Sequence, residues 1–278
     1  MYNNNVGIIK GIPQLLQEGP DILFELGVDS IQLNGWETEY ATPEVARKIK
    51  DMLGGKIEIT SVWGGWSAPR IWNFVDGPEV LGIVPEAYRF IRMKELAQWA
   101  HFTAEIGAPY MASHMGFLPE SPSYPGYRGV IDAILYVGYE CKSVGVGFNF
   151  ETGQETPSCL MRVIQDTGMD NLGINLDPAN LIMYGKGNPI DAIGVFGDKI
   201  RGIHVKDGNY PKDNFYNLGH ETQVGEGSVN WPVFLPTLLK SGYKGDLYIE
   251  RETSGEQQII DIKQTIKFLR KTLAEAAE

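Results

Sequence analysis

The sequence has few cysteines and few basic residues, and both shortages exclude classes of protein. Its only cysteines among 278 residues are Cys141 and Cys159, and neither lies in a CxxC motif or a Cys/His-rich run. This excludes a disulfide framework and argues against a structural zinc site built on them. Asp and Glu number 35 against 24 Lys and Arg, a formal net charge of −11. Nucleic acids and anionic membranes are bound through basic faces, so we expect neither as a partner.

Long apolar runs and an export signal are missing as well. No apolar run approaches the roughly 18 residues that a membrane-spanning helix needs. Residues 1–10 contain no basic segment followed by an apolar stretch and a small-residue cleavage site. We therefore expect a cytoplasmic protein whose thiols stay reduced.

Short apolar segments alternate with longer amphipathic ones along the chain. The short segments are rich in β-branched and apolar residues and predict strands at residues 6–9, 28–33, 57–62, 110–114, 146–151, 172–177, 202–206 and 246–250. The amphipathic segments predict helices at residues 13–26, 43–53, 85–106, 129–143, 156–167, 189–196, 231–240 and 257–276. Several helices end in Gly and turn directly into the next apolar segment, which is typical of a βα repeat.

The eight strand–helix units predict an α/β fold, a (β/α)8 TIM barrel. The units average about 35 residues, close to the ~31 of a 250-residue barrel. A doubly wound open sheet is the alternative, but no Gly-x-Gly-x-x-Gly motif follows the first strand. The sequence has no linker, charge block or low-complexity tract, so residues 1–278 are expected to form a single domain.

Four predicted strands in the second half of the chain end in side chains that bind metal ions in many proteins. Glu151, Asp177, His204 and Glu250 follow one another at spacings of 26, 27 and 46 residues. The first two spacings equal about one repeat, and the third adds the insertion 207–230, so consecutive strands direct these groups to one place. Three buried carboxylates repel one another unless a cation neutralises them. The set predicts one divalent metal ion, with Mn²⁺ or Mg²⁺ favoured and Zn²⁺ or Co²⁺ as alternatives.

Two long connections follow predicted strands, over residues 63–84 and 207–230. Connections of this length are usually lids or binding loops, and in a barrel both lie on the C-terminal face, where active sites form. Aromatic residues crowd the first connection, and Trp66 is a candidate for packing against the C–H face of a sugar. A dimer interface or a loop core is the alternative interpretation of these aromatics.

Five short segments carry a resemblance to a known family: Phe150-Glu151-Thr152, Asn175-Leu176-Asp177-Pro178-Ala179-Asn180, Ile203-His204-Val205-Lys206-Asp207, Val224-Gly225-Glu226-Gly227 and Tyr248-Ile249-Glu250-Arg251-Glu252. Through them the chain resembles the sugar isomerase/epimerase superfamily with a xylose isomerase-like barrel, which includes ketose 3-epimerases and inosose dehydratases. The resemblance implies that Glu151, Asp177, His204 and Glu250 hold one divalent metal. It also implies that Glu151 and Glu250 carry protons on opposite sides of the substrate. Many ketose epimerases have a His three residues after the Asp, whereas this chain has Asn180, which puts the substrate class in question.

The resulting hypothesis is proton abstraction next to a carbonyl group of a sugar. Glu151 or Glu250 removes the proton and the other returns it from the opposite face, through a metal-stabilised enediolate. His114, Lys206 and Asn180 are candidates for binding the substrate; a core histidine, a structural ion pair and a helix cap are the respective alternatives. We therefore expect a metal-dependent sugar epimerase or isomerase of carbohydrate metabolism, with a small-molecule sugar as its partner and a homo-oligomer as a possible state.

Other functions compete with this hypothesis. If a β-hydroxyl leaves from the same enediolate, the enzyme is a lyase or dehydratase acting on a keto-sugar, inosose or keto-glycoside. A non-catalytic sugar-binding barrel predicts a missing proton carrier, whereas both acids are present. An apurinic-site endonuclease needs a histidine-rich cluster of three metals, and a chain with four His does not favour it. Arg70 and Arg128 are candidates for binding a phosphate, but no Gly-rich cradle accompanies them, which favours an unphosphorylated sugar or glycoside.

Overall fold

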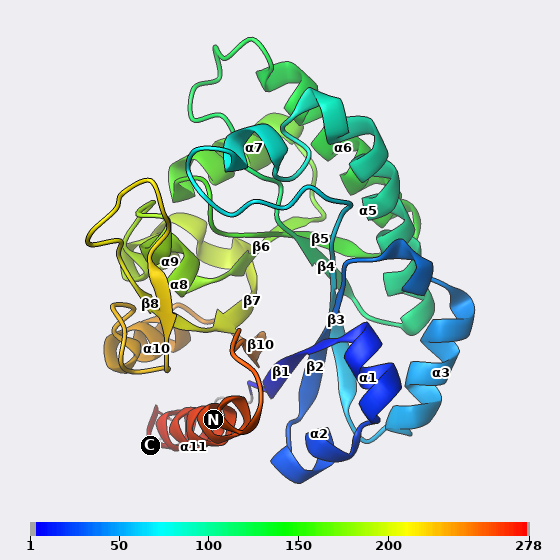
Figure 1. Cartoon of the computed structure of the whole chain (residues 1–278), viewed down its shortest axis with the longest axis vertical. Coiled ribbons are helices and arrows are strands. Elements are labelled where there is room, and N and C mark those ends of the chain that lie inside the picture. Colours follow the sequence, from blue (N-terminus) through cyan, green and yellow to red (C-terminus); the bar gives the residue numbers. More distant parts are fainter. Residues whose placement is uncertain (1–3, 277–278) are drawn as a thin grey trace.

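Within residues 4–276, the part of the chain that this computed structural model describes, eight parallel strands close into a barrel surrounded by helices (Figure 1). Their order around the ring is β1-β10-β7-β6-β5-β4-β3-β2. The strands are β1 (Val6–Gly11), β2 (Ser30–Gly35), β3 (Glu58–Gly64), β4 (Tyr110–Ser113), β5 (Gly147–Glu151), β6 (Leu172–Leu176), β7 (Ile200–Val205) and β10 (Asp246–Ile249). Because β1 pairs with β10, the ring is closed. The predicted (β/α)8 TIM barrel is confirmed, and the open sheet is excluded.

The helices alternate with the strands, as predicted, except that one predicted helix is divided in two and two short helices are additions. They are α1 (Ile12–Glu18), α2 (Asp21–Leu26), α3 (Pro43–Leu53), α4 (Gly77–Val80), α5 (Glu86–Ile106), α6 (Tyr127–Ser143), α7 (Pro157–Thr167), α8 (Pro178–Met183), α9 (Pro189–Phe196), α10 (Trp231–Lys240) and α11 (Glu256–Ala276), with 3₁₀ turns at Thr38–Tyr40 and Gly197–Lys199. The single helix predicted over residues 13–26 is wrong, because Gly19, at φ 80°, and Pro20 separate α1 from α2. The short helices α4 and α8 are additions, and the Asp177 side chain caps α8 by accepting a hydrogen bond from the Asn180 backbone N–H.

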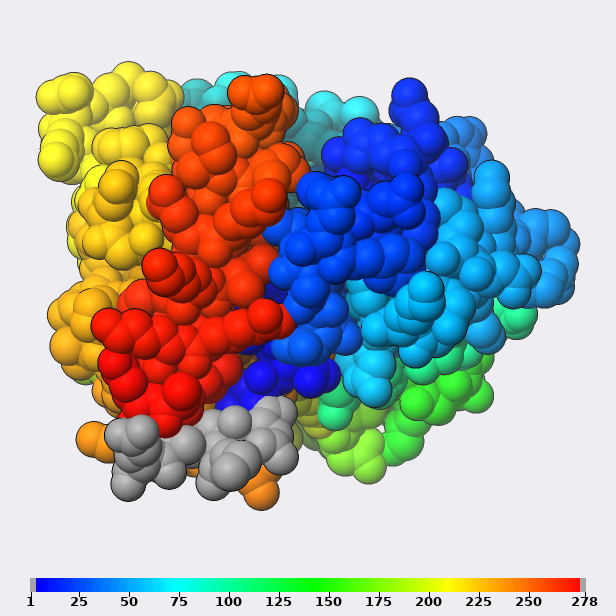
Figure 2. All heavy atoms as spheres, turned by 90° about the horizontal axis from the view of Figure 1, so that it is seen from below, coloured from blue at the N-terminus to red at the C-terminus, as the bar shows by residue number. Residues whose placement is uncertain are grey.

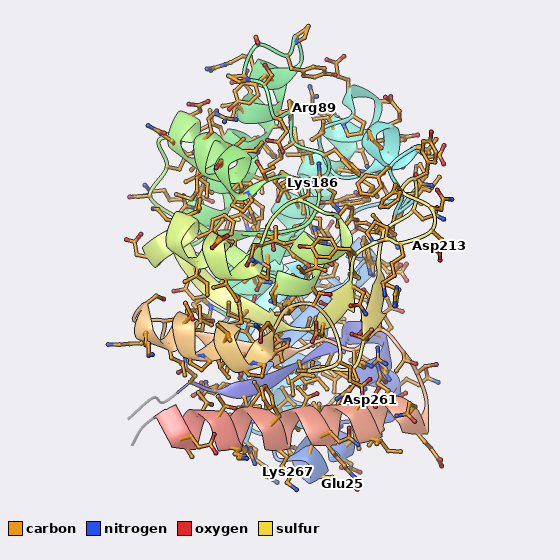
Figure 3. The ribbon with its side chains drawn as sticks, turned by 90° about the vertical axis from the view of Figure 1, so that its left-hand side faces the viewer. Glu25, Arg89, Lys186, Asp213, Asp261 and Lys267 are labelled. Atoms are coloured by element: carbon orange, nitrogen blue, oxygen red, sulfur yellow. The ribbon has the colours of Figure 1, made fainter. Side chains whose placement is uncertain are left out.

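The last helix covers the seam where the ring closes. Figure 2 shows α11 beside the N-terminal elements, and Figure 3 shows it running along one edge of the molecule, with Asp261 near its beginning and Lys267 further along. A continuous apolar core lies between the barrel and its helices. In the described part of the chain, the helices lack the combination of length and apolar character that crossing a membrane requires.

Both long connections lie at the C-terminal end of the barrel, where the sequence places them. The connection after β3 contains α4, and the connection after β7 contains the hairpin of β8 (Asp207–Asn209) and β9 (His220–Thr222). The Asp207 carboxylate fixes the second connection by accepting four backbone N–H groups between residues 208 and 229. The backbone N–H of Phe74 donates to the carbonyl oxygen of Tyr216 at 3.2 Å, so the two connections touch.

A buried arginine anchors the connection after β3. The Arg92 side chain of α5 is fully buried, and its guanidinium donates hydrogen bonds to the backbone carbonyls of Ser67, Pro69, Val80 and Gly82. Burial lowers the pKa of Arg92 to about 10, so the group stays protonated at neutral pH. One charged side chain thus satisfies four backbone carbonyls that find no hydrogen-bond donor in a sheet or helix.

We expect Arg92→Met to lower the free energy of unfolding by about 3 kcal/mol or more, because it leaves buried carbonyl groups without donors. Arg92→Lys should restore only part of the loss, since one ammonium group lacks the fork of donors that reaches all four acceptors. Urea titrations measure both variants. Arg128→Met is the control, because Arg128 is exposed and its pair with Asp132 contributes little. A loss for Arg92→Met no larger than the control would contradict the anchoring role.

A buried carboxyl group makes the stability of the fold depend on pH. Glu155, in the connection after β5, is 3% exposed, and its Oε1 atom makes no hydrogen bond within residues 4–276. Burial raises the pKa of Glu155 to about 8. In the unfolded chain the value is about 4.3, so between these two values the native state keeps a proton that the unfolded state has lost. The free energy of unfolding therefore falls as the pH rises through this window.

Glu155→Gln should remove a pH dependence of up to about 1.4 kcal/mol per pH unit between roughly pH 5 and 8. The variant gains stability over the wild type as the pH rises, because it no longer has to ionise a buried group. Urea titrations in EDTA across this range measure the difference. A difference that is the same at pH 5 and pH 8 would show that Glu155 ionises normally in the native state.

Candidate metal centre and substrate cavity

The four strand-end groups predicted to bind a metal lie together at the C-terminal end of the barrel. They come from neighbouring strands of the ring: Glu151 ends β5, Asp177 follows β6, His204 lies in β7 and Glu250 follows β10. One ligand atom of each residue lies within 4.8 Å of the others. His204 Nδ1 is 3.0 Å from Glu250 Oε2, 3.2 Å from Glu151 Oε1 and 3.8 Å from Asp177 Oδ2. We call these four residues the acid cluster.

The acid cluster fits a divalent cation. Asp177 Oδ2, His204 Nδ1 and Glu250 Oε2 are buried and make no hydrogen bond within the described residues. Buried polar atoms are normally paired, so three unpaired atoms around one space indicate a missing positive partner. Carboxylate oxygens with one imidazole nitrogen suit Mg²⁺, Mn²⁺ or Zn²⁺. The cluster is therefore a possible metal site.

The surroundings keep two of the acids ionised. Burial works to raise the pKa of Glu151, but the neighbouring imidazoles of His114 and His204 hold it well below its usual range. Burial also works to raise the pKa of Glu250, but Lys206 and His204 lower it to about 2. Both groups are carboxylates at neutral pH, which is the form that binds a cation or accepts a proton.

Lys206 is the buried counter-charge of the acid cluster. It directly follows β7, and its Nζ atom lies 3.0 Å from Glu252 Oε1, 3.5 Å from Glu250 Oε1 and 3.8 Å from Asp177 Oδ2. Burial works to lower the pKa of Lys206, but these acids raise it well above its usual value. Of the two roles considered for Lys206, the structure shows contact with the acids. Binding of a substrate oxygen stays a prediction.

A cavity of about 440 Å³ opens onto the acid cluster. The predicted residues that line it are Glu151, His204, Glu250, His114, Asn180 and Lys206. Aromatic and apolar side chains form much of the remaining wall, among them Trp36, Trp63, Trp72, Met183, Tyr184 and Leu218. A concave, partly aromatic cavity with a few converging polar groups is typical of a small-molecule site.

The tryptophans near the cavity take two different positions. Trp36, Trp63 and Trp72 line the cavity, whereas Trp66, predicted to contact the substrate, is fully buried and does not line it. The Trp66 indole N–H donates to the His114 carbonyl oxygen at 3.1 Å, which holds the ring behind the wall. The structure therefore assigns Trp66 to packing. Trp36 was assigned no role from the sequence, although its position directly after β2 is the signal that could have identified it.

Glu151 accepts hydrogen bonds on both of its oxygens. The Trp63 indole N–H donates to Oε2. His114 Nε2 lies 3.2 Å from Oε1, and the Asn180 side-chain amide donates to the same oxygen at 3.4 Å. His114 and Asn180 thus contact a candidate metal ligand and also face the cavity. Their predicted bonds to a substrate stay predictions.

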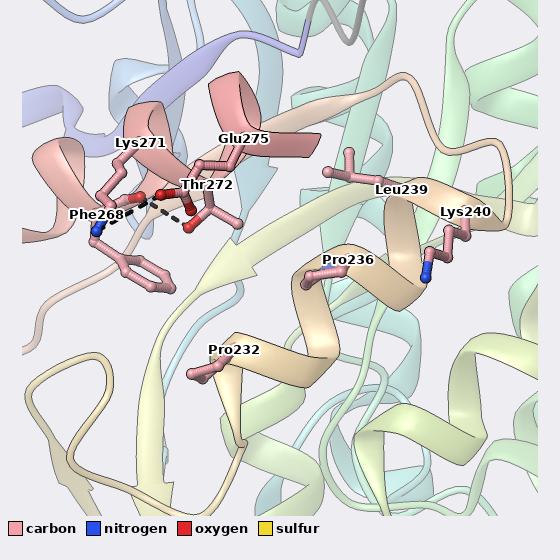
Figure 4. A pocket seen from close by; sticks show the side chains of 8 residues that line it. All are labelled: Pro232, Pro236, Leu239, Lys240, Phe268, Lys271, Thr272 and Glu275. Carbon is pink, nitrogen blue, oxygen red and sulfur yellow. Dashed lines mark hydrogen bonds and ion pairs between the residues drawn. The ribbon is translucent and has the colours of Figure 1, made fainter. Parts of the chain in front are cut away.

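The two arginines considered for phosphate binding lie outside the cavity lining. Arg70 stacks on Trp36, with its guanidinium carbon 4.2 Å from the ring centroid, and Arg128 pairs with Asp132 on the surface. A second hollow, also about 440 Å³, lies between α10 and α11 on the outside of the barrel (Figure 4). Its acid, Glu275, faces Lys271 at 3.6 Å. The acid cluster therefore belongs to the cavity at the C-terminal end of the barrel and not to this outer hollow.

Comparison with known proteins agrees with this architecture. The family model described as "Xylose isomerase-like TIM barrel" matches residues 20–272. A xylose isomerase domain protein from Planctomyces limnophilus is 30% identical, with a TM-score of 0.91, and the alignment covers 99% of this chain and 100% of that chain. An L-ribulose 3-epimerase shares the fold at 18% identity and a TM-score of 0.74, and the alignment covers 99% of this chain and 96% of that chain. A probable 3-DHS dehydratase from Bacillus anthracis shares the fold at 15% identity and a TM-score of 0.68, and the alignment covers 95% of this chain and 99% of that chain.

No curated protein matches the chain. The family model nevertheless spans most of the barrel, from α2 through most of α11, and so includes the four residues of the acid cluster. The chain therefore belongs to the xylose isomerase-like TIM barrel family.

Proposed function

We propose that the protein is a divalent-metal-dependent sugar epimerase or isomerase that moves a proton on the carbon next to a carbonyl group. The arrangement of Glu151 and Glu250 carries this proposal. Oε1 of Glu151 and Oε2 of Glu250 lie beside His204 Nδ1. The other oxygen of each carboxylate contacts a residue outside the acid cluster. Both residues also line the cavity. Two ionised acids in one cavity support removal of a proton by one and its return by the other.

The surroundings suit each acid to proton transfer. The second oxygen of Glu151 accepts the indole N–H of Trp63, a group that donates only and therefore fixes the carboxylate without taking up its proton. The second oxygen of Glu250 lies 3.5 Å from Lys206 Nζ. Removal by one acid and delivery by the other, from opposite faces, inverts the carbon between them. A divalent cation held by the acid cluster supplies Lewis-acid stabilisation of the charge that develops on the carbonyl oxygen.

A neutral sugar suits the cavity better than a phosphorylated one. Among the cationic residues that line it, Lys206 contacts the acids, and Arg251 pairs with Glu221 at 3.0 Å and Asp261 at 2.8 Å. Their charge is thus largely offset within the protein. The indole rings of the wall offer apolar faces to sugar C–H groups and exclude water. We place the reaction in carbohydrate metabolism, with a small-molecule sugar as substrate and Mn²⁺ or Mg²⁺ as the metal.

A lyase or dehydratase acting on a keto-sugar, inosose or keto-glycoside is the second candidate. Loss of a group β to a carbonyl begins with the same proton abstraction, so the same two acids serve both reactions. Asn180 supports this candidate, because many ketose epimerases that the sequence resembles carry a histidine there. A probable dehydratase also shares the fold.

The metal site predicts that removing the ion lowers stability and that Asp177→Asn weakens binding. At about 100 times its dissociation constant, Mn²⁺ should stabilise the native state by roughly 2.7 kcal/mol. Asp177→Asn keeps a side-chain oxygen to cap α8 but removes a ligand charge. It should weaken Mn²⁺ binding about tenfold or more, since even residues that only support a ligand have effects of that size. Urea titrations with and without Mn²⁺ give the stabilisation, and calorimetric titration of EDTA-stripped protein gives the dissociation constants.

Asp261→Asn is the matched control for this measurement. Asp261 is also a buried acid, but it pairs with Arg251 outside the acid cluster. Its substitution should leave Mn²⁺ affinity unchanged. A wild-type protein that binds no divalent ion, or an Asp177→Asn variant that binds as tightly as the wild type, would contradict the metal site.

Glu151→Gln and Glu250→Gln should each lower conversion of the true substrate by about 100-fold or more, because each removes a proton carrier. Each variant also removes a ligand charge, as Asp177→Asn does, so the activities are compared at saturating Mn²⁺. Deuterium incorporation from D₂O, followed by NMR on a panel of free ketoses, phosphorylated ketoses, inososes and keto-glycosides, identifies the substrate. Glu140→Gln on α6 is the surface control and should keep full activity.

The products on this panel separate the candidate functions. Exchange with an epimer or isomer as product supports the main proposal, whereas loss of water or of an aglycone supports the second candidate. Metal binding without exchange on any member would instead indicate a sugar-binding barrel. Full activity of either glutamine variant would overturn the assignment of the two proton carriers.

A further inference from the structure

Gln32 of β2 contacts the histidine of the acid cluster from inside the barrel. Its Oε1 atom lies 2.7 Å from His204 Nε2, the ring nitrogen that faces away from the three carboxylates. Both side chains are buried, at 0% and 1% exposed. Strands β2 and β7 are not neighbours in the ring, because β1 and β10 lie between them. The contact therefore spans the interior of the barrel beneath the acid cluster.

Two further hydrogen bonds fix which end of the Gln32 amide faces His204. The amide nitrogen donates to Ser61 Oγ on β3 at 3.0 Å and to Asn175 Oδ1 on β6 at 3.3 Å. An amide nitrogen has two hydrogen atoms, so both are engaged. The carbonyl oxygen is left for His204. This oxygen accepts hydrogen bonds and cannot donate them.

The orientation of the amide determines which nitrogen of His204 carries the proton. Facing an acceptor at 2.7 Å, Nε2 has to carry hydrogen to make the bond. A neutral imidazole that is protonated on Nε2 has its lone pair on Nδ1. Nδ1 is the atom that faces Glu151, Asp177 and Glu250.

We propose that Gln32 is a positioning residue of the metal centre: it holds His204 in the tautomer and ring orientation that present Nδ1 to a divalent cation. The inference rests on the metal-dependent function proposed above and assigns a role to a residue that binds neither metal nor substrate. A buried amide between Ile31 and Leu33 has no packing advantage there, since each of its polar atoms has to find a partner. The bonds of Gln32 meet that need and orient a ligand.

Gln32→Met tests the proposal, because methionine has a similar length but no carbonyl oxygen. We expect the dissociation constant for Mn²⁺ to rise about 10- to 100-fold, the range typical of lost support for a metal ligand. Gln32→Glu keeps an acceptor facing Nε2 but places a second acceptor opposite Asn175 Oδ1, so it should recover part of the affinity that Gln32→Met loses. Calorimetric titration of the EDTA-stripped proteins gives the constants.

Asn149→Leu is the matched control. Asn149 on β5 is another buried amide of the barrel wall, at 2% exposed, and it hydrogen-bonds none of the four clustered residues in the described part of the chain. It should leave the Mn²⁺ constant unchanged. Equal weakening by Asn149→Leu and Gln32→Met would reduce Gln32 to a general packing role and overturn the proposal.

NMR of the wild-type protein tests the tautomer without any substitution. In ¹⁵N-histidine-labelled protein loaded with diamagnetic Zn²⁺, the His204 spectrum should show a protonated Nε2 and a metal-bound Nδ1. Gln32→Met should change this pattern, and Gln32→Glu should restore it. Zn²⁺ bound through Nε2, or an unchanged pattern and affinity in Gln32→Met, would overturn the role of Gln32. A wild-type protein that binds neither ion would instead overturn the metal-dependent function itself, so the two failures are distinguishable.

Discussion

The repulsion between three carboxylates buried in one small space is the constraint on which the functional end of this barrel depends. Glu151, Asp177 and Glu250 place ligand oxygens within 4.8 Å of one another, in surroundings where water screens their charge less than in bulk solution. The chain answers with one positive charge, from Lys206, which directly follows β7. A single ammonium group does not balance three cluster carboxylates together with Glu252, which also faces Lys206. The remaining deficit of positive charge makes the cluster suited to a divalent cation.

A parallel barrel meets this constraint at little structural cost. Neighbouring strands lie about 4.8 Å apart, so groups that end β5, β6, β7 and β10 at one level come within ligand distance without any special loop. The covering connections are then free to shape the cavity, provided that their own polar groups are satisfied. Arg92 does this for the connection after β3, and Asp207 for the connection after β7. In both, one charged side chain replaces the hydrogen bonds that regular structure supplies elsewhere.

The sequence predicts the features that depend on periodicity and spacing, but it does not predict the direction in which a side chain points. The strands and the meeting of the four clustered residues follow from repeats, because a repeat of one unit returns the chain to the same level of the barrel. Trp66 was expected at the cavity and instead lies behind it, because a pattern of aromatics in an irregular connection does not say which indole turns inward. Gln32 lies 172 positions from His204 and alternates with Ser30 and Asn34 along β2, a pattern that indicates a polar face but does not name the partner.

Buried polar residues of this kind make the barrel interior partly polar. In most barrels of this type, layers of branched apolar side chains fill the centre. Here Gln32, Ser61 and Asn175 form a hydrogen-bonded layer beneath the acid cluster, although burying amides gives no advantage over packing methyl groups. The layer is reasonable if the ligands have to be held from below while the cavity stays open above. The polar interior and the acidic strand ends then serve the same site. Acids that repel one another keep their arrangement only when the one neutral ligand among them, His204, is held in place.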